Sequence, residues 1–435
     1  MNENLTFALA IQNHKENNLQ AAENLYKEVL KTNFNHFESI YNLGTIFAQT
    51  KRFDLAKKLL FKAIKIKPNY ADAHNNFGNV LKELGEYQKA ISSYQMAVKY
   101  KPENLLYLYH LSKLDEEILN SNLKNKIYEI IESSDTTKKN IAYGNFLLSR
   151  YELKDKKYKD EFNYLLKGHQ YYFESENKKF KKKVEYSLNI LPKTKELINL
   201  NINNKKISKD SNMIKPIFII GVPRCGSTLI EKVIASGSQY IPIGEETSII
   251  DNVFANLINN TQLLNSDIKN FQTKIVETYK QKGLVQEKSD YMFTDKSLEN
   301  FLYIDIIKKV FPHAKVINCR RNALSTIMST FKNNLVQLAW THNLEHIFKY
   351  HDIYYQMIKN FEKTFPNFIY DLQYEKFVSD PENEAKKLMK FCDLPWDIKC
   401  LEFYKRGDLI SKTASNIQFR KAIYNDSINK YLPYQ

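Results

Sequence analysis

Small and apolar residues recur at a spacing of 34 positions along the first hundred residues of the chain. The matching positions are Leu43 and Gly44 with Phe77 and Gly78, Phe53 with Tyr87, Ala56 with Ala90, Ala63 with Ala97, and Pro68 with Pro102. Small residues let two helices approach closely and a proline ends a helix, so the pattern predicts consecutive pairs of helices. One pair cannot bury its own apolar face, so neighbouring pairs must stack. Leu19, Ala22 and Val29 keep the same register and predict a further unit at the start of the chain.

The period and the order of these residues resemble the tetratricopeptide repeat. The resemblance implies an N-terminal α-solenoid over residues 1–175, with its clearest repeats in 1–102. From about residue 103 the register is lost, although the stretch AYGNFLLSRYELKDKKYKDEFNYLLKGHQYY is still typical of one divergent repeat. Residues 176–214 are polar and rich in lysine, so we predict a linker there and place the domain boundary in it.

Beyond the linker, the apolar pattern changes to an alternation of strands and helices. The run PIFIIG predicts a short buried strand, and the following STLIEKVIAS carries apolar residues at helical spacing. YMFTD, KVINC and NFIYDL predict further strands, each followed by a helical segment. The alternation predicts a central parallel sheet with helices on both faces over residues 215–435.

Composition narrows the functional classes only a little. The chain has 435 residues and a net charge of +15, mostly from lysine in a sequence that is also rich in Asn, Ile and Tyr. This charge favours anionic ligands in general, and we do not expect nucleic-acid binding. Neither a membrane-spanning segment nor a secretory signal is visible, so we expect a cytoplasmic protein. The four cysteines lack metal-binding spacing, which predicts reduced thiols and no metal: Cys225, Cys319, Cys392 and Cys400.

One glycine-rich loop carries the first candidate chemistry. In FIIGVPRCGSTLIEKVI, Gly221 and Gly226 bracket four residues, as in the phosphate-binding loop G-x-x-x-x-G-K-[ST], but Ser227 replaces the lysine. Backbone N–H groups and the N-terminus of the next helix can bind a phosphate-like anion without that lysine. Mg²⁺-dependent ATP hydrolysis is poorly supported without it, which disfavours a nucleotide kinase.

A second anion site is predicted about a hundred residues later. In CRRNALSTIMS, Arg321 ends a strand and Ser329 follows eight residues later in a helix. Both are placed near the carboxyl edge of the sheet, where α/β proteins bind ligands. A guanidinium with a hydroxyl suits a phosphate, although either feature alone could be structural. Together with the glycine loop, they favour a ligand that carries anions at both ends.

The motifs PRCGSTL, GEET, DK, RRNALSTIMS, LPW and TASNIQFRKAIYNDSINKY, in this order, resemble the sulfotransferases that use 3′-phosphoadenosine 5′-phosphosulfate. They are most similar to the branch with N-terminal tetratricopeptide repeats, related to tyrosylprotein sulfotransferases. The resemblance implies a P-loop-like α/β sulfotransferase domain that transfers a sulfuryl group in line to an acceptor hydroxyl. It also implies contacts to this co-substrate from Arg224, Cys225, Gly226, Ser227, Thr228, Arg321, Ser329, Ser415 and Lys430.

The resemblance further implies two catalytic residues. Lys296 would neutralise the leaving oxygen, although without the motif order it would pass for a surface lysine. Glu246, the second carboxylate of GEET, would deprotonate the acceptor. Glu245 and Glu246 could instead favour a helix N-terminus electrostatically. Small-molecule sulfotransferases use a histidine base, and the candidates are His342, His346 and His351.

A peptide tyrosine is the favoured acceptor, because its phenol has a pKa of about 10 and is easier to deprotonate than an alkyl alcohol. A glycan, a small alcohol and an inactive repeat scaffold stay open as alternatives. The repeats are expected to bind an acceptor polypeptide, another hydroxyl-bearing polymer or a separate partner, and a homodimer is compatible with the sequence. Two departures from tyrosylprotein sulfotransferases stand out. No membrane segment is visible in this sequence, and it ends five residues after Lys430, earlier than the resemblance leads us to expect, so we expect a terminal element to be missing.

Overall fold

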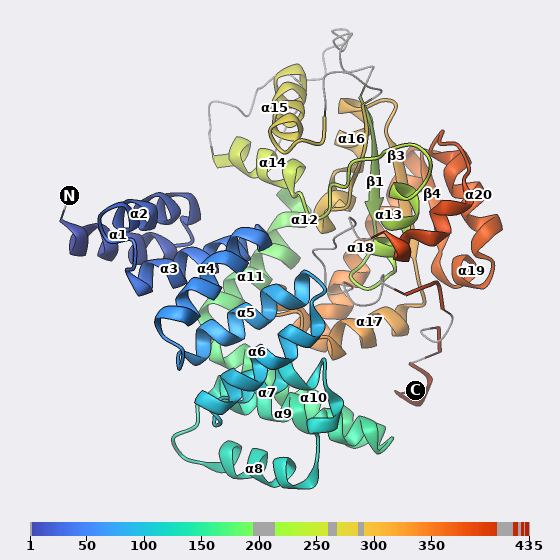
Figure 1. Ribbon diagram of the computed structural model, residues 1–435. Helices are drawn as coiled ribbons and strands as arrows, with labels where there is room; N and C mark the ends of the chain where they lie inside the picture. The colour runs from blue at the N-terminus through green and yellow to red at the C-terminus, as the bar shows by residue number, and fades with distance from the viewer. Residues whose placement is uncertain are drawn as a thin grey trace. The chain divides into compact units, whose positions relative to one another are not determined.

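The computed structural model describes residues 2–194, 214–259, 268–285, 291–406, 421–424, 428–429 and 431–434 (Figure 1). The chain forms two compact units, Met1–Ser175 and Glu176–Gln435. We call the first the repeat unit and the second the sheet unit. No helix in the described ranges is both long enough and apolar enough to cross a membrane.

The described part of the repeat unit is helical. Its α-helices are α1 (Glu3–Lys15), α2 (Leu19–Thr32), α3 (Phe37–Gln49), α4 (Phe53–Ile66), α5 (Ala71–Glu83), α6 (Tyr87–Tyr100), α7 (Leu105–Ser112), α8 (Ser121–Glu132), α9 (Lys138–Lys154) and α10 (Tyr158–Ser175). Helix α1 packs on α2, α3 on α4, α5 on α6, and α9 on α10. The helix pairs predicted from the 34-residue period are therefore confirmed.

The recurring small residues lie where paired helices cross. A Cβ atom at Gly44 of α3 would lie 3.1 Å from Cγ of Leu60 in α4, and one at Gly78 of α5 would lie 2.6 Å from the Tyr94 ring in α6. The recurring Ala56 and Ala90 are fully buried. These residues recur because a larger side chain would push the helices apart.

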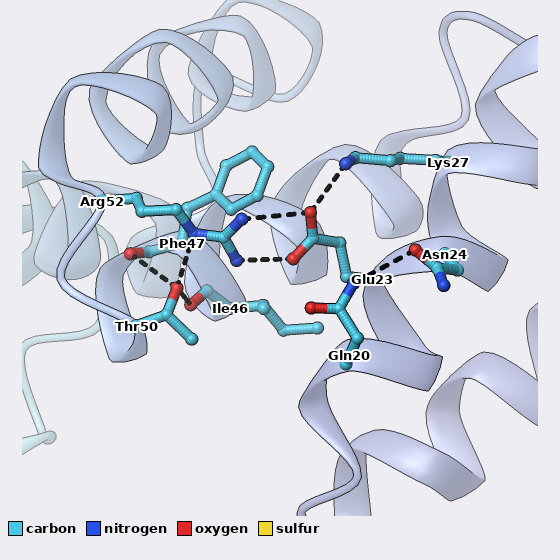
Figure 2. A network of polar contacts seen from close by, with 8 residues as sticks. All are labelled: Gln20, Glu23, Asn24, Lys27, Ile46, Phe47, Thr50 and Arg52. Carbon is cyan, nitrogen blue, oxygen red and sulfur yellow. Dashed lines mark hydrogen bonds and ion pairs between the residues drawn. The ribbon is translucent and has the colours of Figure 1, made fainter. Parts of the chain in front are cut away.

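An ion cluster around a buried carboxylate connects the first two helix pairs (Figure 2). Glu23 of α2 is only 2% exposed, and its carboxylate accepts hydrogen bonds from both terminal nitrogens of Arg52, which precedes α4. Lys27 contributes a second cation 2.6 Å away. The Arg52 guanidinium also lies over the Phe47 ring, 4.3 Å from its centre. A charge buried this deeply is tolerated because it is paired.

We expect Glu23→Gln to lower the free energy of local unfolding around α2 and α3 by about 1–3 kcal/mol, because it weakens a buried charge-assisted contact. Hydrogen exchange of these helices in the full chain measures the effect. The control is Glu38→Gln, because Glu38 pairs with Lys67 while 49% exposed and should contribute about 0–1 kcal/mol. The hydrogen bonds from Arg52 lower the pKa of Glu23. The stabilisation should therefore be present above the unfolded pKa of about 4.3 and be lost as the pH falls through the lower folded pKa. Equal effects of the two substitutions would contradict a stabilising role of the buried cluster.

The strands described in the sheet unit form one parallel sheet with the order β2-β1-β3-β4. They are β1 (Ile214–Ile220), β2 (Tyr291–Asp295), β3 (Lys315–Arg320) and β4 (Ile369–Gln373). The predicted parallel sheet is confirmed. Strand β1 pairs with strands on both sides, and Ile217–Ile220 are at most 1% exposed. This central position explains why PIFIIG is continuously apolar.

The described α-helices of the sheet unit precede, connect and follow these strands. They are α11 (Asn177–Glu185), α12 (Leu191–Thr194), α13 (Ser227–Ala235), α14 (Ile249–Asn259), α15 (Ile268–Gln281), α16 (Ile304–Val310), α17 (Ala323–Lys332), α18 (Leu344–Thr364), α19 (Tyr374–Ser379) and α20 (Pro381–Phe391).

The described part of the predicted linker 176–214 is folded. Helices α11 and α12 flank a π-helical turn over Tyr186–Ile190. Phe180 is 3% exposed and stacks on the His342 ring at 5.2 Å between centres. The many lysines led us to predict a linker. Apolar residues at helical spacing lie between the lysines, however, and they bury one face of the helical segment.

Candidate functional site

The four strands bring predicted site residues, together with Tyr374, to one edge of the sheet. The glycine loop 221–226 follows β1, and Lys296 follows β2. Arg321 comes directly after the last residue of β3, and Tyr374 comes directly after the last residue of β4. All four strands are parallel, so their carboxyl ends lie at the same edge. Open α/β sheets bind their ligands at this edge.

The glycine loop has a conformation that excludes side chains at its end. Gly226 precedes α13 with a φ of +100°, and a Cβ atom there would lie 2.4 Å from the Tyr374 ring. Glycine is thus required for both its backbone conformation and the close ring contact. Gly226 supplies no capping side chain to α13. The first turn of α13, which begins at Ser227, is therefore the kind of helix N-terminus that favours an anion.

Two arginines and a serine meet beside this loop. Nε of Arg224 donates to Oγ of Ser329 at 3.1 Å, although the residues are 105 positions apart. Nη1 of Arg321 donates to the backbone carbonyl of Arg224 at 3.1 Å, and its guanidinium lies 4.7 Å from the centre of the Tyr374 ring. Burial and the charge of Arg321 lower the pKa of Arg224 to about 10. Arg224 is therefore still cationic at neutral pH, and an anion bound between the two guanidinium groups would relieve their repulsion.

The donor set fits a nucleotide with phosphate groups at two positions. Guanidinium groups, hydroxyls and backbone N–H groups all donate hydrogen bonds, and a guanidinium group binds phosphate through two parallel hydrogen bonds in a fixed geometry.

Cys225 differs from its neighbours in the loop in the direction of its side chain. Its side chain is fully buried, its N–H donates to the carbonyl of Val222, and a hydrogen bond from the Cys319 thiol lowers its thiol pKa to about 7. Its thiol thus faces the protein interior, beneath the loop.

Lys296 lies in a buried ion cluster. Its ammonium is 3.1 Å from Oε1 of Glu245 and 4.0 Å from Oε2 of Glu231, and its side chain is 7% exposed. Burial disfavours the charged ammonium, but the carboxylates of Glu231 and Glu245 outweigh it and raise the pKa of Lys296. Lys296 is therefore not the surface lysine that its sequence context alone would allow.

The two adjacent glutamates of GEET occupy different environments. Glu245 is 7% exposed, whereas Glu246 is exposed and has a φ of +52°. Two backbone hydrogen bonds hold the GEET loop against Lys296. The N–H of Lys296 donates to the carbonyl of Gly244 at 2.9 Å, and the N–H of Glu246 donates to the carbonyl of Lys296 at 3.0 Å. Glu246 is thus accessible to an acceptor beside the lysine, while Glu245 is committed to an ion pair.

A buried carboxylate fixes the two loops that carry these residues. Asp295 is fully buried and accepts hydrogen bonds from the side chains of Thr247, Tyr279, Ser297 and Asn300. The Ser297 hydroxyl in turn accepts from the N–H of Ser248 at 2.9 Å. Sequence reasoning missed this role of Asp295, as it missed Glu231 and Tyr374. The signal for Asp295 was an acidic residue that ends a buried strand.

Two of the three alternative histidine bases, His342 and His351, lie in buried positions. His342 and His351 are 3% and 4% exposed. Burial lowers the pKa of His351 to about 4, so its ring is neutral at pH 7. Burial also lowers the pKa of His346 in α18. An acceptor reaches the exposed Glu246 more readily than the two buried rings.

Two predicted co-substrate contacts, Ser415 and Lys430, lie outside the described residues. Described residues close to Lys430 contact α17, the helix that carries Ser329. The carbonyl of Ile428 accepts from Oγ of Ser325 at 3.2 Å, and Nζ of Lys332 donates to the Tyr434 hydroxyl at 2.6 Å.

Comparisons with known proteins agree with this architecture. Residues 216–398 match the sulfotransferase family, and residues 37–70 and 59–92 match tetratricopeptide repeats. An uncharacterized protein of Aquifex aeolicus is 26% identical over 405 residues, which cover 87% of this chain and 51% of that protein. Protein-tyrosine sulfotransferase 1 of Danio rerio is 23% identical over 207 residues, which cover 42% of this chain and 54% of that protein.

The chain thus spans about half the length of these two curated relatives. Among solved structures, the sulfotransferase domain of the Synechococcus PCC 7002 olefin synthase is 19% identical, covers 52% of this chain and 91% of that domain, and has a TM-score of 0.37. The protein carries tetratricopeptide repeats followed by a sulfotransferase-family domain, with distant similarity to protein-tyrosine sulfotransferases.

Proposed function

We propose that the sheet unit transfers a sulfuryl group from 3′-phosphoadenosine 5′-phosphosulfate to an acceptor hydroxyl. The observation that carries the proposal is the meeting of Arg224, Arg321 and Ser329 beside a phosphate-type loop that lacks its lysine, in a sulfotransferase-family domain. This arrangement offers cations and hydroxyls for anions at both ends of the nucleotide and no lysine for a triphosphate.

The proposed donor supplies a sulfuryl group that is already activated by its phosphate leaving group. The N–H groups at the start of α13 and Arg224 would hold the 5′-phosphosulfate, and Arg321 with Ser329 would hold the 3′-phosphate. Ser415 and Lys430 stay proposed contacts. The loop residues position the nucleotide, and the positive charge around it stabilises the charge that develops on the leaving phosphate.

The proposed base is Glu246, and the proposed charge-stabilising residue is Lys296. Glu246 is exposed and next to Lys296 through a backbone hydrogen bond of 3.0 Å. It would accept the acceptor's proton as the oxygen attacks sulfur, while the Lys296 ammonium neutralises the departing oxygen. The network around Asp295 keeps the two loops in register during this step.

For the acceptor we propose a tyrosine of a polypeptide that the repeat unit binds. Two observations support this choice: relatives of the sheet unit are named protein-tyrosine sulfotransferases, and a phenol is acidic enough for a carboxylate base. Carbohydrate and small-molecule acceptors are the competing candidates. The four cysteines are free and buried, which is compatible with a reducing compartment, and we propose a cytoplasmic location.

The test is transfer of ³⁵S from labelled donor to a tyrosine-containing polypeptide by the full chain. We expect label on tyrosine, and stronger inhibition by adenosine 3′,5′-bisphosphate than by AMP. Arg321→Ala should weaken this inhibition roughly 10- to 150-fold, the loss expected for one charge-assisted contact of about 1.5–3 kcal/mol.

Arg320→Ala is the matched control, because the neighbouring Arg320 pairs with Glu362 and Asp371 instead. It should leave inhibition by the bisphosphate nearly unchanged. Equal inhibition by AMP and the bisphosphate would overturn the donor assignment. Label that appears only on a glycan or a small alcohol would retain the donor and replace the acceptor, and an absence of any label with intact bisphosphate binding would favour the inactive scaffold.

A further inference from the structure

The buried carboxylate of Glu231 has no role in the function proposed so far. Glu231 lies in α13, one turn after the glycine loop, and is 0% exposed. Its Oε1 accepts a hydrogen bond of 2.9 Å from Oγ1 of Thr294 in β2. Its Oε2 is buried and has no hydrogen-bond donor among the described residues. That oxygen lies 4.0 Å from Nζ of Lys296 and 3.8 Å from Nζ of Lys232.

Packing alone gives no reason for a carboxylate at this position. Its helix neighbours Ile230, Val233 and Ile234 are fully buried and apolar. Taking a carboxylate out of water is costly, and an apolar residue of similar size in place of a buried ion pair is often as stable or more stable. A long apolar side chain would therefore serve the core at least as well.

Two ammonium groups lie near Glu231, that of Lys232 at 3.8 Å and that of Lys296 at 4.0 Å, and Lys296 is the one that belongs to the predicted site. The lysine ammonium is shared between two carboxylates, closely with Glu245 and more loosely with Glu231. The groups that face Glu231 come from three segments: Lys232 from α13, Thr294 and Lys296 from β2 and the residue after it, and Glu245 from the GEET loop. The charged members of this cluster are two lysines, Lys232 and Lys296, and two glutamates, Glu231 and Glu245. If all four are ionised, the cluster has no net charge, and the two carboxylates compensate the charge of Lys296 and Lys232.

We propose that Glu231 is a positioning residue for Lys296. While the donor is absent, the Glu231 carboxylate holds the Lys296 ammonium by electrostatic attraction. When the anionic donor binds and attracts that ammonium, Glu231 takes up a proton from solvent. This inference rests on the proposed function, because it requires an anionic donor at the glycine loop.

The electrostatics of the cluster support this exchange. Burial and the nearby charge of Glu245 raise the pKa of Glu231 to about 7, against the opposing effect of Lys296 and Lys232. Protonation of Glu231 leaves the cluster with one excess positive charge, which favours a bound anion. By linkage, an anionic donor must raise the pKa of Glu231 further, so binding near neutral pH takes up protons at this residue.

The experiment compares binding of adenosine 3′,5′-bisphosphate to the full-length wild type and to Glu231→Gln, by calorimetry at pH 6 and pH 8. Gln keeps the shape of the side chain and stays neutral at both values. At pH 6 the wild-type Glu231 is largely protonated, so the two proteins should bind almost equally. At pH 8 it is ionised, and the variant should bind about three- to tenfold more tightly, since one unfavourable charge nearby is removed. The protonation of the nucleotide itself cancels in the comparison.

Two controls separate positioning from other effects. Glu152→Gln makes the same change at a carboxylate that is 5% exposed and pairs with Lys124 in the repeat unit, and it should give no difference at either pH. In a Lys296→Met background the difference at pH 8 should disappear, because Glu231 without its lysine stays protonated.

Each result either supports or contradicts the proposed positioning role of Glu231. A difference that appears at pH 8, vanishes at pH 6 and depends on Lys296 supports the proposal. If the wild type and Glu231→Gln bind the nucleotide with the same pH dependence, or if the difference persists in full without Lys296, the positioning role is overturned and the proposed function stands. If the wild type does not bind the nucleotide at either pH, the proposed function fails, and the role of Glu231 fails with it.

Discussion

Replacing Glu246 with glutamine should lower kcat for sulfuryl transfer to a tyrosine acceptor by about 10²- to 10⁴-fold, the usual contribution of a general base. Glu246 is exposed beside Lys296, so an acceptor hydroxyl can reach its carboxylate. Gln keeps the size of the side chain and its ability to accept a hydrogen bond, but it cannot take a proton at neutral pH. The affinity for adenosine 3′,5′-bisphosphate should change little, because the base acts on the acceptor.

The neighbouring Glu245 provides a matched control for this prediction. It is buried and paired with Lys296 at 3.1 Å. Glu245→Gln should therefore loosen the lysine and lower thermal stability, whereas Glu246→Gln should leave stability nearly unchanged. Steady-state kinetics with labelled donor and thermal unfolding measure both effects. A Glu246→Gln variant with normal kcat, alongside a Glu245→Gln variant that is stable but cannot turn over, would transfer the role of base to Glu245.

Lys296→Met should lower kcat by about 10²- to 10³-fold, comparable to the loss of one preorganised group that stabilises transition-state charge. The effect on donor affinity should be smaller, because negative charge on the leaving phosphate is greatest in the transition state. Met retains the length and apolar volume of the lysine stem, so packing around the position is kept. Single-turnover measurements at saturating donor isolate the chemical step.

The ion cluster complicates the lysine variant, because Glu231 and Glu245 lose their shared cation. An unpaired buried carboxylate is destabilising and becomes protonated. The combined variant Lys296→Met with Glu245→Gln removes one of these carboxylates, so it should recover much of any lost stability without recovering turnover. Recovery of turnover in the combined variant would show that the single substitution had acted through misfolding, and the role of Lys296 would have to be assigned elsewhere.

Local patterns in the sequence predicted most of the architecture. The 34-residue period predicted the helix pairs because Gly44 and Gly78 each meet a large side chain of the partner helix, where an added Cβ would be crowded at Gly44 and would clash at Gly78. The apolar run PIFIIG predicted the central strand because both of its faces are buried. The order of short motifs along the chain pointed to the sulfotransferase family, and Arg224, Arg321 and Ser329 could be named from it. Such signals are readable because each depends on residues that are close in sequence or in a fixed order.

Only the tertiary structure decided how the charged residues are used. GEET contains two adjacent glutamates that look equivalent in the sequence, yet Glu245 is buried and paired with Lys296 whereas Glu246 is exposed, although both lie beside the end of β2. Nothing in the sequence marks Glu231, and its burial and its hydrogen bond from Thr294 in β2 are visible only in the folded chain. Likewise, the contact between Arg224 and Ser329 joins residues 105 positions apart. Burial and ion pairing depend on which distant segments of the chain come into contact. A single sequence shows residue types and their local spacing, but it does not show these tertiary contacts.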